Sequence, residues 1–160
     1  MEEKTNTYLS FYLGNELFGI HIGNVLEVLK NETITHVPKT RDFIRGIINF
    51  RGEIVSVIDF YEKLNLPKHD EYSEKVIIVL EFIDGENPVK VAVLADKVKK
   101  VFEEADSKIK SVPEFSSYYN PEFLNGAVKD EEGFILLLNV EKIFTEQEVE
   151  LIKNTENNNK

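Results

Sequence analysis

The feature that most constrains the fold is a pair of short apolar runs joined by a tight polar corner. The runs, at residues 47–48 and 54–58, are rich in isoleucine and valine, which favour buried strands of a pleated sheet. The corner between them, Asn49-Phe50-Arg51-Gly52-Glu53, contains a glycine, as short hairpin connections usually do. The segment therefore predicts a β-hairpin that carries Arg51 at the tip of a rigid scaffold.

The chemistry of this corner favours recognition over catalysis. A guanidinium group offers five donors in a planar fork that fits a carboxylate. No residue beside Arg51 has the character of a catalytic nucleophile or base. The alternative is a solvated turn residue, because surface ion pairs contribute only about 0–1 kcal/mol.

The rest of the chain continues as short strands between turn signals. A polar connector is expected at 65–73 and irregular backbone at 111–121, while Asn24–Leu29 fits either a helical turn or a continued strand. A short helical turn is expected at Tyr61–Leu64. The further predicted strands are 8–13, 16–22, 76–83, 89–95, 98–102, 123–128 and 133–140.

The C-terminal segment begins with a helix start signal. Thr145-Glu146-Gln147-Glu148 is a capping box, and Val149, Leu151 and Ile152 behind it are available for burial. The following residues, Asn154–Lys160, are polar and are expected to fray.

A weak internal repeat divides the chain. Phe43-Ile44-Arg45-Gly46 recurs 80 residues later as Phe123-Leu124-Asn125-Gly126, and residues 54–59 match residues 134–139 at the same offset. Apolar positions in 18–29 recur in 91–102 at an offset of 73. A true repeat would make each half a small antiparallel β-barrel of about five strands. The alternative is that apolar strands resemble one another by composition alone.

The two copies differ at the corner. The first copy has Arg51-Gly52, whereas the same offset in the second gives Glu131-Glu132. A purely structural turn has no need of this difference, so the first corner is expected to have a partner of its own.

Composition excludes several classes of function. The 160 residues suffice for one domain or two small subdomains, and the net charge of −10 disfavours nucleic acid and anionic lipid as partners. The absence of cysteine excludes disulfides, thiol catalysis and thiolate zinc sites. His21, His36 and His69 are scattered, so no metal site is expected.

No membrane or secretory segment is expected. The N-terminal residues lack the basic and apolar regions of a signal peptide. The longest apolar run, Val76–Ile83, has eight residues and includes Glu81, which is too short to cross a bilayer. We therefore expect a cytoplasmic protein with no direct membrane insertion.

Motifs of catalysis are also missing from the sequence. The eight glycines are dispersed and form no phosphate-binding loop, and there is no Gly-x-Ser-x-Gly elbow. We therefore predict no catalytic residues and no cofactor. Arg41, Arg45 and Arg51 lie within eleven residues, and they either form one basic patch or point in different directions.

The central segment fits a family pattern. It has a proline (Pro38), then Phe43-Ile44-Arg45-Gly46, then Asn49-Phe50-Arg51-Gly52, then an apolar strand that ends in Asp59. It resembles the CheW family of bacterial chemotaxis coupling proteins, which has leucine where this chain has Phe50. Other segments agree in order and spacing, so that the resemblance covers about residues 7–153: 18–20, 25–28, 91–101, 113–115, 123–126 and 135–144.

The resemblance implies a mainly β fold. It predicts one CheW-like domain over 7–153, made of two SH3-like five-stranded antiparallel β-barrel subdomains packed together, with short helical turns and a C-terminal helix. The approximate boundary between the subdomains is near 65–75, and 154–160 form a frayed tail.

The resemblance also implies a function and its partners. CheW proteins are non-enzymatic adaptors that link the cytoplasmic hairpin tip of chemoreceptors (methyl-accepting chemotaxis proteins) to the regulatory domain of the histidine kinase CheA. Such an adaptor would be recruited to membrane-bound receptor arrays. Two other readings remain: a regulatory β-barrel that binds a small ligand in a deep pocket, and, far behind, an enzyme with convergent titratable groups in a cleft.

Site residues follow from the same resemblance. Glu27 and Arg51 match a family pair that bridges two elements, and if the pair is partly buried, Arg51→Glu would cost about 3–5 kcal/mol. Lys110 and Phe115 match the interface with the kinase and the ring, although core packing is an equal alternative for Phe115. The residues implied in receptor binding are Val25, Glu27, Asn49, Phe50, Arg51, Gly52 and Val101.

Overall fold

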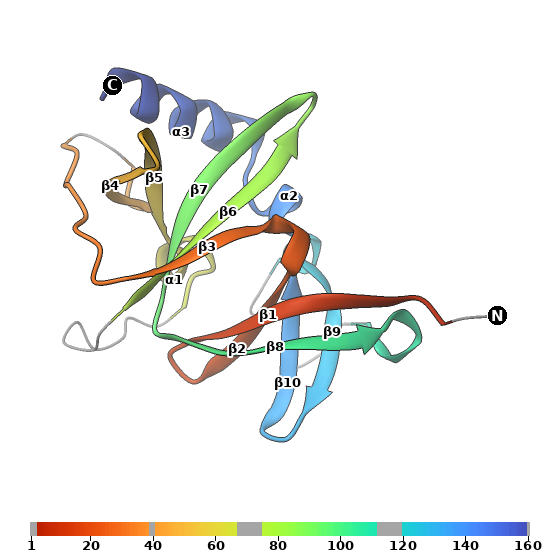
Figure 1. Ribbon diagram of the computed structural model, residues 1–160. Coiled ribbons are helices and arrows are strands. Elements are labelled where there is room, and N and C mark those ends of the chain that lie inside the picture. The colour runs from red at the N-terminus through yellow and green to blue at the C-terminus, as the bar shows by residue number, and fades with distance from the viewer. Residues whose placement is uncertain (1–2, 39–40, 67–74, 112–119, 160) are drawn as a thin grey trace.

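Two five-stranded sheets form the molecule, a computed structural model that describes residues 3–38, 41–66, 75–111 and 120–159 (Figure 1). Sheet 1 has the strand order β8-β1-β2-β10-β9 and sheet 2 the order β3-β6-β7-β5-β4. The mainly β fold with two SH3-like five-stranded units is therefore confirmed. Each sheet keeps two open edges in this order, so neither is the closed barrel that was predicted.

The strand bounds follow the predicted runs to within a few residues. In sheet 1 they are β8 (Lys97–Ala105), β1 (Thr5–Leu13), β2 (Glu16–His21), β10 (Gly133–Leu138) and β9 (Leu124–Asp130). In sheet 2 they are β3 (Val25–Lys30), β6 (Val76–Asp84), β7 (Asn87–Ala95), β5 (Glu53–Asp59) and β4 (Ile44–Phe50). The ambiguous segment 24–29 is thus a strand, preceded by the 3₁₀ turn η1 (Ile22–Asn24).

Short helical elements connect the strands. They are α1 (Phe60–Lys63), η2 (Asp106–Lys108), η4 (Pro121–Phe123), α2 (Val140–Ile143) and α3 (Glu146–Asn158). The turn α1 confirms the helical turn that was predicted near Tyr61. By contrast, α2 begins where the strand was expected to continue to Val140, because the chain leaves the sheet there and buries Val140 and Ile143 in the core.

The two halves of the chain exchange strands. Strands β1 and β2 join β8, β9 and β10, whereas β3, β4 and β5 join β6 and β7. The predicted boundary near 65–75 therefore separates the two sequence repeats, but it does not separate the two sheets. The prediction that each half builds its own barrel is wrong, because the chain passes between the sheets at η1 and again between β7 and β8.

The repeat itself is confirmed by the register of the strands. Phe18 on β2 pairs in parallel with Leu136 on β10, and Val91 on β7 pairs in parallel with Ser56 on β5. These partners are related by the offsets of 73 and 80 that the sequence indicates. Each sheet therefore contains one parallel pair, which corrects the prediction of purely antiparallel sheets.

Each sheet is buried on both faces near the middle of the molecule. Ile78 and Leu80 of β6 belong to the large apolar core between the sheets, whereas Ile77 and Val79 belong to a smaller core enclosed by sheet 2. A third cluster, which includes Leu17 and Ile135, is enclosed by sheet 1. This arrangement explains why β6 reads as an apolar run without alternation.

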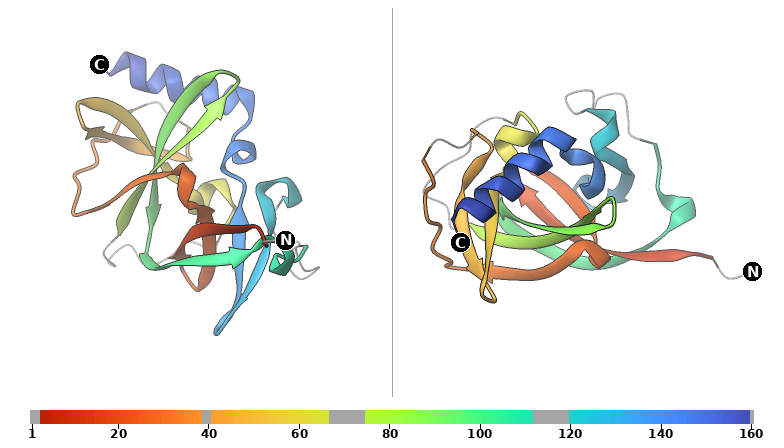
Figure 2. Two further views of the ribbon diagram at one scale, coloured as in Figure 1. Left: turned by 45° about the vertical axis from the view of Figure 1, so that its right-hand side comes forward. Right: turned by 90° about the horizontal axis from the view of Figure 1, so that it is seen from above.

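The C-terminal helix packs against sheet 2 (Figure 2). Its capping box is confirmed: the Glu148 N–H donates to Thr145 Oγ1 at 3.1 Å, and the Thr145 N–H donates to Glu148 Oε1 at 2.9 Å. The helix runs to Asn158, so fraying from residue 154 is wrong. Thr155 is buried, and Glu156 Oε1 accepts a hydrogen bond from the Ser56 N–H at 3.1 Å, which holds this end against β5.

Candidate docking surface

The β4–β5 corner is a rigid two-residue turn. Phe50 pairs with Glu53, and Arg51 and Gly52 between them both have positive φ, at 51° and 84°. Two positive φ values define the tight hairpin turn whose twist matches its strands. Asn49 Oδ1 accepts the Gly52 N–H at 3.0 Å and fixes the turn from inside. The hairpin predicted from the sequence is therefore confirmed, with Arg51 at its tip.

Two groups contact the Arg51 side chain. Its Nη2 lies 3.5 Å from Glu27 Oε2 on β3, and its Cζ lies 4.7 Å from the ring centroid of Phe50. The ring itself is buried. The structure thus brings Glu27 and Arg51 together as predicted, but their side chains are 42% and 65% exposed. An exposed pair at this distance contributes about 0–1 kcal/mol, which corrects the larger value considered for a buried pair.

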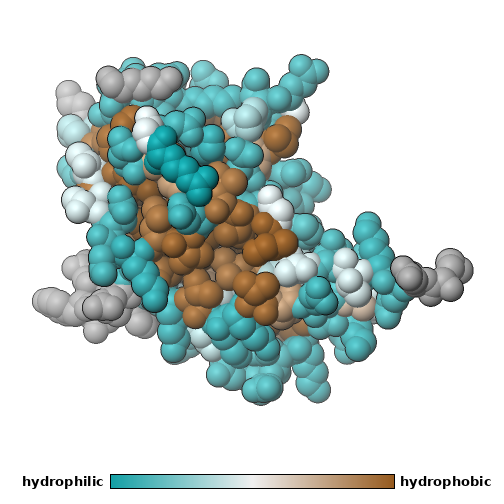
Figure 3. Space-filling model, viewed as in Figure 1, coloured by the Kyte–Doolittle hydropathy of each residue, from teal (hydrophilic) through white to brown (hydrophobic). Residues whose placement is uncertain are grey.

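An apolar strip lies where the two sheets meet at the surface. It consists of Val25 and Val28 on β3 and Val98 and Val101 on β8, which we call the docking strip. Their cross-strand partners are, in the same order, Leu80, Ile78, Phe11 and Leu9, all members of the core between the sheets. The strip is therefore the outer margin of that core. Val28 and Val101 are 36% and 57% exposed, and Figure 3 shows apolar atoms gathered over this part of the face.

The strip and the corner flank the same strand. Glu27 lies between Val25 and Val28 in sequence, but its partner Val79 belongs to the core enclosed by sheet 2. Its side chain therefore projects toward the opposite face of β3. Because β3 is an edge strand of its sheet, both faces can be reached along the open edge. Five of the residues implied in receptor binding, Asn49 to Gly52 and Glu27, thus form one corner beside the strip that contains Val25 and Val101.

The two residues implied in kinase binding lie elsewhere. Lys110 is exposed and exchanges backbone hydrogen bonds with Ala127 on β9, at 2.9 and 2.8 Å. It therefore lies at the β9 edge of sheet 1, at the other end of the strand order from β8 and Val101. Phe115 lies outside the described residues.

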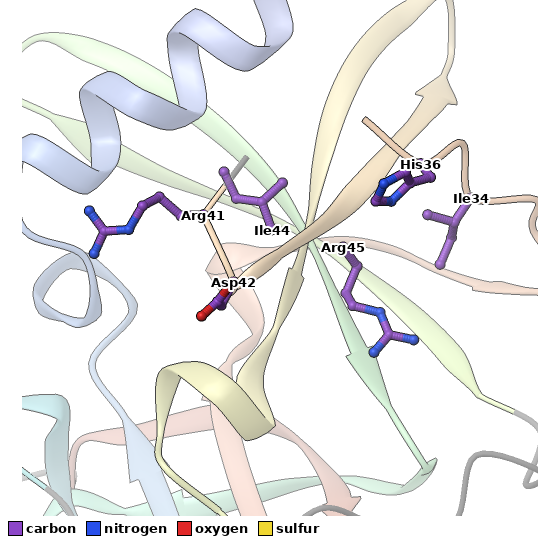
Figure 4. Close-up of a pocket in the computed structure, with 6 residues that line it drawn as sticks. All are labelled: Ile34, His36, Arg41, Asp42, Ile44 and Arg45. Atoms are coloured by element: carbon purple, nitrogen blue, oxygen red, sulfur yellow. The ribbon is translucent and has the colours of Figure 1, made fainter. Parts of the chain in front are cut away.

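An open pocket lies beside the start of β4 (Figure 4). It is lined by Ile34, His36, Arg41, Asp42, Ile44 and Arg45. The side chains of Arg41 and Arg45 point in opposite directions, and Arg45 Nη1 lies 3.3 Å from Asp59 Oδ2. Since Arg51 contacts Glu27 instead, the three arginines point in different directions and form no single patch. In the part of the chain that the structure describes, no three His, Asp or Glu side chains gather as a metal site would need.

Two carboxylate clusters escaped the sequence reasoning. Asp130, at the end of β9, contacts Lys99 Nζ closely and lies 3.3 Å from Lys100 Nζ. The hydrogen bond from Lys99 holds the pKa of Asp130 below its usual range, against the effect of burial. The other cluster surrounds Asp96, where the sequence indicated only a bend. Neither cluster has a local sequence signal, because the partners are far apart along the chain.

Comparisons with known proteins agree with this architecture. The CheW-like domain family matches residues 7–148. The chain is 34% identical over 147 residues to chemotaxis protein CheW of Klebsiella aerogenes, covering 92% of this chain and 86% of the relative. It is 30% identical over 138 residues to CheW of Thermotoga maritima, covering 86% and 87%.

A solved structure has the same fold. The scaffolding protein TtCheW from Thermoanaerobacter tengcongensis is similar with a TM-score of 0.76 and 29% identity, covering 88% of this chain and 93% of that one. The architecture is thus that of a chemotaxis scaffold. This chain belongs to the CheW family, and the resemblance found in its sequence is confirmed.

Proposed function

We propose that this protein is an adaptor that couples the cytoplasmic tips of chemoreceptors to the histidine kinase CheA. Membership of the CheW family over residues 7–148 supports this role. The observation that carries it is the docking strip, an exposed apolar margin shared by two sheets and flanked by the Arg51 corner. A surface of this kind suits recognition, since a few apolar anchors and oriented polar groups are what a docked helix requires.

The receptor tip would lie along the open edge of β3. A helical hairpin would place apolar side chains against Val25 and Val101 of the docking strip. Its carboxylates would meet the Arg51 guanidinium, which already lies near one carboxylate, Glu27, and keeps donors exposed to solvent. The turn that holds Asn49, Phe50 and Gly52 would supply the rigid support, so that little conformational entropy is lost on binding.

The kinase would dock elsewhere on the molecule. The regulatory domain of CheA would contact the region of Lys110 and Phe115, with an apolar centre and a polar rim. Separate surfaces would allow one adaptor to hold both partners at once.

This role places the protein at receptor arrays beside the membrane, held there by its partners. Within the described residues, no helix combines the length and apolar character needed to cross a bilayer. Recruitment by a receptor would therefore provide the association with the membrane.

A titration with two partners tests the proposal. The full chain is titrated with a soluble helical-hairpin fragment of a chemoreceptor and with a CheA regulatory domain, separately and together. We expect binding to each and a ternary complex. Val101→Arg places a charge in the docking strip and should weaken receptor binding at least about tenfold, as loss of an anchor does, while leaving kinase binding unchanged.

Ile83→Arg is the matched control. Ile83 is 51% exposed on β6, similar to Val101 at 57%, but it pairs with Pro88 beside the β6–β7 turn, away from the docking strip. Its substitution should leave receptor affinity unchanged. Equal affinities for Val101→Arg, Val25→Arg and the unaltered chain would show that the receptor binds elsewhere.

A further inference from the structure

Asp96 occupies a singular position between the two sheets. It is the one residue between the end of β7 in sheet 2 and the start of β8 in sheet 1. Its own N–H donates to the Tyr12 carbonyl on β1 at 2.9 Å. The chain therefore changes sheets within one residue, and that residue carries a carboxylate whose side chain is only 12% exposed.

Donors from both sheets converge on this carboxylate. From sheet 1, the N–H of Gly14 in the β1–β2 turn donates to Oδ2 at 2.5 Å. From the segments that flank strands of sheet 2, the Tyr61 hydroxyl in α1 donates to Oδ2 and the Lys75 ammonium group before β6 donates to Oδ1. One side chain thus joins four segments that are separate in sequence.

The electrostatics agree with this geometry. Burial alone would raise the pKa of Asp96, but the bonds from Lys75, Tyr61 and Gly14 outweigh burial and lower it. Burial and the neighbouring carboxylate raise the pKa of the Tyr61 hydroxyl, so that it remains a donor. The Lys75 Nζ also lies 5.7 Å from the centroid of the Tyr61 ring. The carboxylate is therefore ionised and well satisfied at neutral pH.

The place of Asp96 connects it to the docking strip. The strip takes Val25 and Val28 from sheet 2 and Val98 and Val101 from sheet 1, so its shape depends on how the two sheets are oriented. Val98 lies two residues after Asp96 on β8. We propose that Asp96 is a positioning residue: it clasps sheet 1 to sheet 2 and thereby sets the spacing of the two halves of the docking strip. The effect on receptor binding rests on the proposed function.

Distance measurements test the clasp without any partner. The chain contains no cysteine, so Glu86→Cys and Glu131→Cys provide the two attachment sites for spin labels. Both residues are exposed, at the β6–β7 turn of sheet 2 and the β9–β10 turn of sheet 1. Double electron–electron resonance should give one narrow distance distribution for the parent chain, a broad one for Asp96→Ala and an intermediate one for Asp96→Asn, which retains an oxygen acceptor.

Asp130→Ala is the matched control. Asp130 is a similarly buried carboxylate with two lysine partners, but all of its bonds lie within sheet 1. It should destabilise the protein without broadening the distribution. A narrow distribution for Asp96→Ala, or equal broadening for Asp130→Ala, would overturn the clasp. If circular dichroism shows that Asp96→Ala does not fold, Asp96→Asn decides the same question.

Receptor titration tests the consequence for docking. Asp96 is outside the docking strip, so its loss should act through the fraction of molecules with the correct orientation of the sheets. If that fraction falls to about one fifth, the apparent Kd for the receptor fragment rises about fivefold. A broadened distribution with unchanged affinity would overturn the link to the docking strip. If the parent chain itself binds no receptor fragment, the proposed function fails, while the distances still decide whether Asp96 is a clasp.

Discussion

Two hairpins of this molecule occupy equivalent places, and their tips differ. Hairpin β4–β5 and hairpin β9–β10 are related by the repeat of 80 residues. The Asp59 N–H donates to the Phe43 carbonyl at 2.8 Å, and the Asn139 N–H donates to the Phe123 carbonyl at 2.7 Å. The backbone scaffold is thus the same in both.

The charges at the two corners are reversed. At the first corner the tip carries a cation, Arg51, and the edge strand β3 carries the acid Glu27. At the second corner β9 carries the acid Asp130 near the tip, and the edge strand β8 carries Lys99 and Lys100.

The burial of the two pairs differs as well. The side chains of Asp130 and Lys99 are 4% and 19% exposed, whereas those of Glu27 and Arg51 are 42% and 65% exposed and lie 3.5 Å apart. One corner is therefore closed by its own ion pairs, and the other keeps its donors accessible. The same scaffold serves stability at one end and recognition at the other.

The largest effect is expected from the shared glycines. A Cβ on Gly46 (φ 155°) would lie 2.3 Å from the Thr35 carbonyl oxygen, and one on Gly126 (φ 150°) would lie 2.6 Å from a methyl of Ile109 and 2.8 Å from the Lys110 carbonyl oxygen. We expect Gly46→Ala to lower the free energy of unfolding by about 2–4 kcal/mol. Gly126→Ala should cost less, because a side chain moves more easily than backbone. Urea unfolding of both variants checks the order, and equal losses would show that the two hairpins tolerate crowding alike.

The next effect separates the two ion pairs. Asp130→Ala leaves Lys99 and Lys100 without their shared carboxylate, and we expect Tm to fall by several degrees. Glu27→Ala removes only an exposed partner at 3.5 Å, so Tm should change by about 2 °C or less. Thermal unfolding followed by circular dichroism measures both. A larger loss for Glu27→Ala would contradict the division between a structural and an accessible corner.

Acid should remove the contribution of the closed corner. Lys99 lowers the pKa of Asp130 in the folded state, so this carboxylate stabilises the protein above its unfolded pKa of about 3.9. The stabilisation is lost as the pH falls through the lower folded value. The difference in Tm between the parent chain and Asp130→Asn should therefore be constant near neutral pH and shrink below about pH 4. A difference that grows in acid would contradict the assignment.

The smallest effect on stability is expected at the Arg51 tip. Arg51→Asn keeps a residue that tolerates positive φ, so the free energy of unfolding should change by no more than about 0.5 kcal/mol. If the corner recognises the receptor, affinity for the receptor fragment falls nonetheless. Glu131→Asn, at the corresponding offset in the other hairpin, is the control and should leave affinity unchanged. Equal affinities for both variants would remove Arg51 from the receptor site.

Local features of the fold were predictable from the sequence. The Arg51-Gly52 turn, the capping box at Thr145 and the repeat depend on residues that are neighbours or that recur at a fixed offset. Such patterns give turn type, helix start and strand face directly.

Strand partners were not predictable in this way. Alternation or apolarity tells which face of a strand is buried, but not which strand lies beside it. The exchange of β1–β2 between the two halves and the parallel pairs of β2 with β10 and β5 with β7 therefore had no signal of their own. Tertiary contacts with β5 likewise extend α3 beyond residue 153, where composition favoured fraying.

The candidate site divides in the same manner. The family pattern placed Glu27 beside Arg51, and the structure confirms that contact. The exposure of the pair and the formation of one strip by β3 and β8 depend on the packing of the sheets. Asp96 and Gly14 are 82 residues apart, so their bond has no trace in local sequence.

The exchange of strands also sets the order in which the chain can fold. Ser10 on β1 bonds to Lys100 on β8, 90 residues later, so the first hairpin emerges from the ribosome long before its sheet can be completed. Contacts of this range slow folding and leave strand edges exposed in the meantime. Neither half should fold when expressed alone, whereas the two halves expressed together should assemble into the native pair of sheets.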